Sequence, residues 1–126
     1  DTHGVPAIYA SLRSGILVNA TRRLRIAEET ETLEEIMRRL GKGEGTVAYG
    51  VDEVERAAKI GAVERLVLAD TMLRESTDEK RLLIEAIMME VERKGGNTMV
   101  VSTEHEAGTK LLALGGVATI LRFPIY

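Results

Sequence analysis

The sequence lacks cysteine and tryptophan and contains few aromatic residues. Without cysteine, disulfide bonds and thiolate metal sites are excluded. Aromatic residues make up 3% of the 126 residues, which argues against a nucleic-acid site built from stacked aromatic side chains. No apolar run approaches the roughly 20 residues of a membrane-spanning helix, and no signal peptide is evident. These absences predict a cytoplasmic protein with no membrane partner.

Acidic residues slightly outnumber basic ones. The net charge is −3, from 17 basic and 20 acidic residues, whereas a dedicated nucleic-acid binder usually has a basic excess. The charges are clustered: residues 22–25 read Arg-Arg-Leu-Arg, and residues 28–31 read Glu-Glu-Thr-Glu. A solvated helix face is the more common explanation of such clusters, and a phosphate-binding patch is the alternative.

Short apolar segments alternate with helical patterns from residue 46 to the end. Strands are expected over residues 46–49, 66–69, 98–101 and 117–123, and helices over residues 52–60, 71–74, 76–94 and 103–114. This alternation indicates an α/β fold whose mainly parallel or mixed sheet carries helices on both faces.

Local signals at the helix ends agree with the alternation. Gly61, the pair at residues 95–96 and the pair at residues 115–116 each follow a helical pattern and can end it in the left-handed conformation. Three capping boxes are expected to begin the helices, formed by Asp52 with Glu55, Ser76 with Glu79, and Thr103 with Glu106.

The first forty residues contain one clear helical segment. Residues 26–40 carry an apolar stripe opposite a charged face, whereas residues 5–12 predict only a short helix that Gly15 can break. The sequence opens on Asp1, not Met, which favours a segment of a longer protein. We therefore interpret residues 1–25 as the end of a preceding domain and residues 26–126 as one α/β domain.

Few residues suggest chemistry. Asp70 and Ser102 each follow a buried strand, at the sheet edge where α/β proteins bind ligands, so a catalytic Asp/Ser pair is conceivable. Turn and capping roles are the commoner explanation for both residues. His105-Glu106 resembles the start of a zinc motif, but Thr109 occupies the position of the second histidine. We expect neither catalysis nor a metal or cofactor in this chain.

Several stretches resemble the C-terminal domain of the Pelota family, ribosome-rescue relatives of the archaeal and eukaryotic peptide-chain release factor. These stretches include Gly61-Ala62-Val63-Glu64-Arg65-Leu66, Asp70-Thr71-Met72-Leu73-Arg74, Ser102-Thr103-Glu104-His105-Glu106-Ala107-Gly108 and Gly115-Gly116-Val117-Ala118-Thr119-Ile120-Leu121-Arg122-Phe123-Pro124. The most specific are those at residues 61–74 and 115–124. The resemblance extends from about residue 1 to the end. It implies a three-layer α/β/α sandwich with a mixed sheet, like that of ribosomal and kink-turn-binding proteins.

The resemblance also implies a function in rescuing stalled ribosomes. Pelota-family proteins enter the vacant A site with a translational GTPase, elongation factor 1 alpha in archaea, and act with an iron–sulfur ABC-type ATPase that splits the subunits. The C-terminal domain is expected to contact both proteins, and mRNA or rRNA contacts are possible for a full-length protein. The endoribonuclease activity proposed for the family is attributed to its N-terminal domain, and a divalent metal is proposed for the full-length proteins.

Two functions remain open on the sequence alone. As a partner-binding domain, the chain offers exposed charges beside its conspicuous motifs, at Arg74, Glu104 and Arg122. The alternative is a structured-RNA binder of the kink-turn type. Residues 50–56 correspond to that family's RNA-gripping helix, but Asp52 replaces its Asn and Arg56 its Lys. An acid beside RNA phosphates is unfavourable, which favours the partner-binding domain.

Overall fold

The computed structural model describes residues 4–125, with side chains described at residue 15 and from residue 17 on. Its elements are α1 (Gly4–Lys42), β1 (Val47–Tyr49), α2 (Val51–Lys59), β2 (Val63–Ala69), α3 (Asp70–Arg74), α4 (Asp78–Arg93), β3 (Asn97–Val101), α5 (Glu106–Ala113) and β4 (Val117–Leu121). Each strand lies within three residues of its predicted bounds. Within residues 4–125, no helix combines the length and apolarity needed to cross a membrane.

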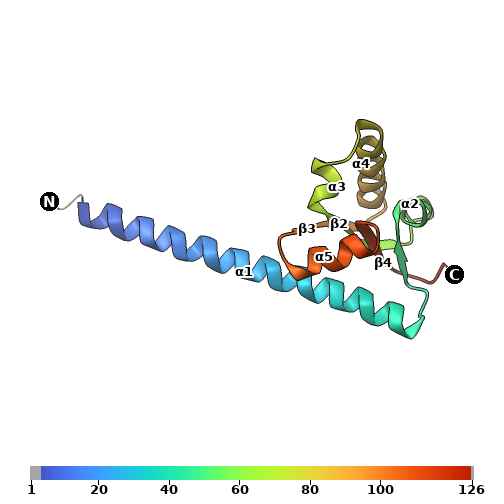
Figure 1. Cartoon of the computed structure of the whole chain (residues 1–126), viewed down its shortest axis with the longest axis horizontal. Helices are drawn as coiled ribbons and strands as arrows, with labels where there is room; N and C mark the ends of the chain where they lie inside the picture. Colours follow the sequence, from blue (N-terminus) through green and yellow to red (C-terminus); the bar gives the residue numbers. More distant parts are fainter. Residues whose placement is uncertain (1–3, 126) are drawn as a thin grey trace.

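The four strands form one mixed sheet in the order β1-β4-β2-β3. Strand β2 is parallel to β3 and antiparallel to β4, and β4 is also antiparallel to β1. Helices α2 and α4 cover one face, while α5 and the second half of α1 cover the other (Figure 1). The predicted α/β/α sandwich with a mixed sheet is therefore confirmed.

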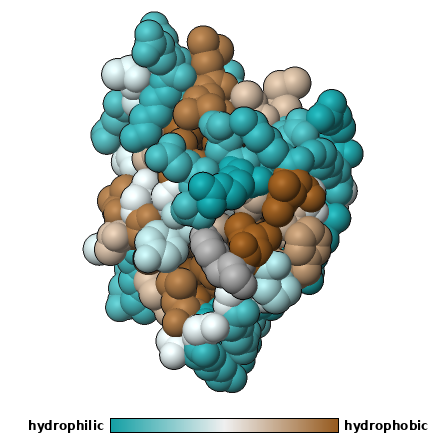
Figure 2. Space-filling model, turned by 90° about the vertical axis from the view of Figure 1, so that its right-hand side faces the viewer, coloured by the Kyte–Doolittle hydropathy of each residue, from teal (hydrophilic) through white to brown (hydrophobic). Residues whose placement is uncertain are grey.

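The core lies on both sides of the two central strands. Leu66, Val67, Leu68 and Ala69 of β2 are fully buried, because helices cover both faces of the sheet. All five residues of β4 are buried as well. On the outer surface, small apolar patches alternate with hydrophilic side chains (Figure 2). The exposed groups on this face therefore do not form a single continuous apolar surface.

Helix α1 is longer than the sequence predicts. It runs unbroken through Gly15 to Lys42, so the expected break at Gly15 and the expected start at residue 26 are wrong. A glycine inside a helix costs only about 1 kcal/mol relative to alanine, which does not end a helix of 39 residues. The side chains of Ile8 and Leu12 lie outside those described, and the assignment of residues 1–25 to a preceding domain stays a prediction.

The predicted capping boxes do not form. Gly50 is the N-cap of α2, and Thr77, not Ser76, caps α4 by accepting the Lys80 N–H. The N-cap of α5 is His105, with no side-chain cap bond, because the Thr103 hydroxyl bonds elsewhere. The predicted glycine stops are correct: Gly61, Gly95, Gly115 and Gly116 all have positive φ.

Candidate functional site

The loop formed by residues 102–105 connects β3 to α5 at the sheet edge where β2 and β3 end. Because β2 and β3 are parallel, the residues that follow them meet at this edge. Two carboxylates from other elements hold the loop, Glu29 of α1 and Asp70 at the end of β2. The loop thereby joins the long helix to the α3 region of the domain.

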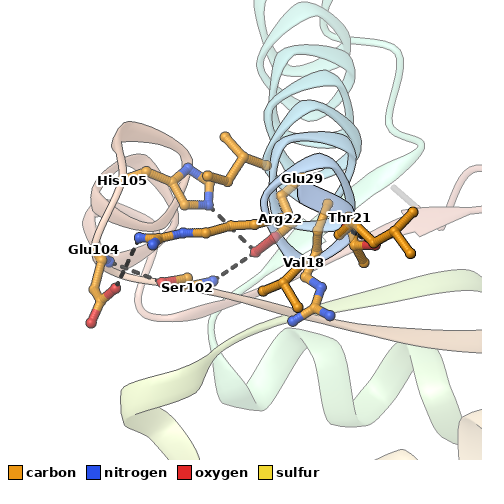
Figure 3. A pocket seen from close by; sticks show the side chains of 10 residues that line it. Val18, Thr21, Arg22, Glu29, Ser102, Glu104 and His105 are labelled. Atoms are coloured by element: carbon orange, nitrogen blue, oxygen red, sulfur yellow. Dashed lines mark hydrogen bonds and ion pairs between the residues drawn. The ribbon is translucent and has the colours of Figure 1, made fainter. Parts of the chain in front are cut away.

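Glu29 is a buried acid that the sequence reading missed. Its residue is 2% exposed, and its Oε1 accepts the Ser102 N–H at 2.7 Å. The same oxygen lies 3.4 Å from Nε2 of His105, and Figure 3 shows both groups pointing at it. One signal could have identified it: Glu29 shares the helical spacing of the buried Leu33 and Ile36, so it lies on the inward stripe of α1.

Asp70 holds the other side of the loop. Its Oδ1 accepts the Thr103 hydroxyl at 2.8 Å and the Thr103 N–H at 3.3 Å, and its Oδ2 lies 3.3 Å from Nη1 of Arg74. Partial burial raises the pKa of Asp70. The Thr103 hydrogen bonds and the Arg74 guanidinium outweigh this effect and hold the pKa below the ordinary value of 3.8.

An open cleft of about 560 Å³ lies beside the Glu29 contact, between residues 17–26 of α1 and this loop. Leu17, Val18 and Ile26 supply an apolar wall, and Arg25 also lines the cleft. Arg22 extends from α1 to within 3.9 Å of the Glu104 carboxylate on the loop (Figure 3). The cleft therefore has apolar and charged walls and is open to solvent.

The sequence relationships of the chain agree with this architecture. A model of the family described as eRF1 domain 3 matches residues 26–125. The chain belongs to the eRF1 domain 3 family. It is 41% identical over 122 residues to the Protein pelota homolog of Methanopyrus kandleri and 40% identical to that of Thermococcus onnurineus. These matches cover 97% of this chain but 35% and 33% of the relatives, so the chain spans about a third of their length.

Solved structures of Pelota proteins share the eRF1 domain 3 fold of this chain. Archaeoglobus fulgidus Pelota is 40% identical with a TM-score of 0.72, over 82% of this chain and 32% of that one. Saccharomyces cerevisiae Dom34, described as interacting with Hbs1, is 34% identical with a TM-score of 0.75, over 79% and 28%. A model of ribosome-bound archaeal Pelota and ABCE1 gives 39% identity and a TM-score of 0.74, over 89% and 30%. The predicted membership of the Pelota family is confirmed.

The predicted partner-binding residues of this eRF1 domain 3 lie at two opposite ends of the sheet. Arg74 and Glu104 flank the loop at the carboxyl end of β2, and both side chains are exposed. Arg122 follows β4, which is antiparallel to β2, so it lies at the amino end of β2, near Glu44 and Glu64. The structure therefore brings together two of the three residues.

The residues considered as catalytic candidates, Asp70 and Ser102, form hydrogen bonds that hold the loop. Asp70 is engaged by Thr103, and the Ser102 hydroxyl accepts the Glu104 N–H at 3.2 Å. The His105 imidazole faces Glu29. Among the described residues, no group of three His, Asp or Glu side chains could hold a metal ion. The arrangement positions a loop and presents charges around it.

The stabilisation by Asp70 is expected to depend on pH. Because its pKa is lowered by folding, its contribution to the free energy of unfolding is complete above the unfolded pKa and is lost as the pH falls through the lower folded value. Asp70→Asn should therefore lower the free energy of unfolding by about 1 kcal/mol at pH 7, and this difference should shrink below pH 3.8. Urea denaturation at pH 7 and pH 3 measures it.

The control is Glu75→Gln, which removes an exposed carboxylate one residue beyond α3. It should change stability little at either pH. A destabilisation by Asp70→Asn that is equally large at pH 3 and pH 7 would contradict the assigned role of the Asp70 charge.

Proposed function

We propose that this chain is the partner-recruiting domain of a Pelota-type ribosome-rescue factor, which recognises stalled ribosomes in the cytoplasm and promotes their disassembly. The domain binds a translational GTPase and a subunit-splitting ABC-type ATPase. One observation carries the proposal: 97% of the chain matches Pelota proteins at about 40% identity. Relatives described as ribosome-bound with ABCE1 and as interacting with Hbs1 support the choice of partners.

Binding, not catalysis, fits the chemistry of the loop edge. The carboxylates of Glu29 and Asp70 are occupied by Ser102 and Thr103, so neither is poised as a general base toward the cleft. Side chains of both signs remain exposed around the loop, at Arg74 and Glu104. Such groups suit the rim of a protein–protein interface, where charge complementarity selects the partner.

The two ends of the sheet offer separate contact sites. Strand β2 has seven residues, so the loop edge and Arg122 are about 20 Å apart along the strands. One edge, with Arg74 and Glu104, and the opposite edge, with Arg122, therefore suit contacts with different proteins or different domains of one protein.

Calorimetric titration with archaeal elongation factor 1 alpha in its GTP form, and separately with the ABC-type ATPase, tests the proposal. Saturable binding is expected for both proteins. Arg74→Ala or Arg122→Ala should weaken the binding of one partner by about 1 to 2 kcal/mol, as expected for an arginine at an interface. Arg38→Ala, which removes an exposed cation from α1, serves as the control and should leave both affinities unchanged.

Two outcomes would overturn the proposal. Binding to neither protein would do so, and so would tight binding of a kink-turn RNA, which would assign the domain to structured-RNA recognition. The second outcome is not expected, because Asp52 at the start of α2 is exposed and Glu53 pairs with Arg56 at 3.6 Å. These two carboxylates disfavour the approach of RNA phosphates to this end of α2.

A further inference from the structure

Charge is segregated between the first part of α1 and the rest of the chain. Residues 2–27 contain four arginines and no acidic residue, whereas residues 28–126 contain 13 basic and 19 acidic residues. The chain is acidic as a whole, but this segment is purely basic. Such asymmetry is typical of proteins in which one segment contacts a polyanion.

The basic segment stands away from the acidic domain. In Figure 1 the first half of α1, drawn in blue, extends beyond the other helices and the sheet. Three of its arginines, Arg22, Arg23 and Arg25, occur within one turn, which we name the arginine turn. This turn lies where the extended part of α1 meets the loop of residues 102–105, and all three arginines are exposed. At 100° per residue they span an arc of about 160° on the helix, so one ligand surface can meet all three.

The charges of the arginine turn are largely unneutralised. Within the described part of the chain, no hydrogen bond or ion pair holds Arg23 or Arg25. Arg22 lies 3.9 Å from Glu104, and both side chains are mostly exposed, at 70% and 81%. An exposed pair at this distance contributes little. Many other cations of the domain are paired within their own helices, as Arg39 is with Glu35 and Lys59 with Glu55.

We infer that the arginine turn binds the phosphate backbone of RNA. One guanidinium group can donate two parallel hydrogen bonds to the oxygens of a phosphate. Three arginines in one helical turn can therefore contact successive phosphates. The scarcity of aromatic residues restricts the contact to the backbone, without base stacking. The acidic residues that follow at positions 28, 29 and 31 disfavour RNA contacts further along α1. The inference stands on charge and exposure and is independent of the GTPase and ATPase contacts proposed above.

Fluorescence anisotropy of a labelled, mixed-sequence single-stranded RNA tests the inference. Three phosphate contacts predict a slope of about −2 in the logarithm of affinity against that of salt, so affinity should fall about 15-fold from 50 to 200 mM salt. The triple variant Arg22→Gln, Arg23→Gln, Arg25→Gln should lose most of this binding and most of the slope. Glu104→Gln should strengthen binding slightly, because it releases Arg22.

A charge-matched control separates a specific site from net charge. Replacing Arg56, Lys59 and Lys110 with Gln removes the same charge from paired, exposed positions on α2 and α5. This variant should keep its RNA affinity within about twofold. Circular dichroism and thermal melting of each variant confirm that the fold is retained.

Three results would overturn the inference. Equal losses in the two triple variants would attribute RNA binding to net charge. Equal affinity for polyglutamate and for RNA at the same salt concentration would point to an acidic protein partner. Preference for a kink-turn RNA, abolished in the variant lacking Arg56, would place the RNA site on α2.

Discussion

Gly108→Ala is expected to lower the free energy of unfolding by about 3 kcal/mol or more, because the change overpacks a buried backbone contact. A methyl group at this position would lie 2.5 Å from Cα of Thr103 and 2.7 Å from the carbonyl carbon of Ser102. It would lie closer still to the Ser102 carbonyl oxygen. Backbone atoms cannot move aside as a flexible side chain would. Helix α5 would have to shift, and the loop would be pulled from Glu29 and Asp70.

Urea denaturation measures this effect, and Gly41→Ala is the matched control. Gly41 lies near the end of α1 with nothing within 4 Å of its added methyl group. Because alanine favours helix over glycine by up to about 1 kcal/mol, this control should be neutral or stabilising. Two variants of equal stability would show that α5 does not approach the loop as closely as the structure indicates.

Ile36→Ala is expected to lower the free energy of unfolding by about 2 to 5 kcal/mol, because it leaves a cavity under α1. Ile36 is fully buried and, with Leu33, attaches the second half of α1 to the core. The variant should also expose α1 to faster amide hydrogen exchange from about residue 29 onward. Urea denaturation and hydrogen exchange followed by mass spectrometry provide the two readouts.

Leu24→Ala tests whether the first half of α1 is independent of the core. Leu24 is 66% exposed near the middle of the helix, ahead of the buried Glu29, so its truncation should change stability by less than about 0.5 kcal/mol. A large effect at Leu24, or a small one at Ile36, would contradict the docking of α1 that the structure shows.

The loop of residues 102–105, which contacts both α1 and Asp70, links the stability of α1 to the proposed partner edge. Glu29 is attached to α1 and Asp70 to the end of β2, and both bind backbone amides of the same short loop. A displacement of α1 would therefore move the loop and, through Asp70, the environment of Arg74. The arginine turn and the proposed partner edge also meet directly, at Arg22 and Glu104.

Much of the fold follows from local patterns in the sequence. The continuous apolar run at residues 66–69 predicts a strand covered on both faces, and the structure buries every residue of it. The glycine stops are correct because only glycine takes positive φ without strain, so its position is a local signal. The motifs at residues 61–74 and 115–124 also point to the Pelota family, whose domain the comparisons confirm.

The Thr103 cap was wrong because a distant residue binds the capping side chain, and the helix break was wrong because one glycine costs a long helix little. Thr103 has the sequence of a helix cap, but Asp70, 33 residues away, binds its hydroxyl. Gly15 has the sequence of a break, but the helix continues through it. Local spacing alone indicates neither the distant partner of Thr103 nor the full length of the helix around Gly15.

The sequence by itself determined the number, order and types of the strands and helices from residue 46 on, because burial and backbone preference are local properties. Only the tertiary structure decided the antiparallel placement of β4, which separates Arg122 from Arg74 and Glu104. It also decided the contacts of the buried Glu29: helical spacing places this residue on the inward stripe of α1, but its partners Ser102 and His105 lie far along the chain. The reason is physical: both depend on contacts between segments far apart in the chain, and their energies appear only when the sheet and α1 pack together.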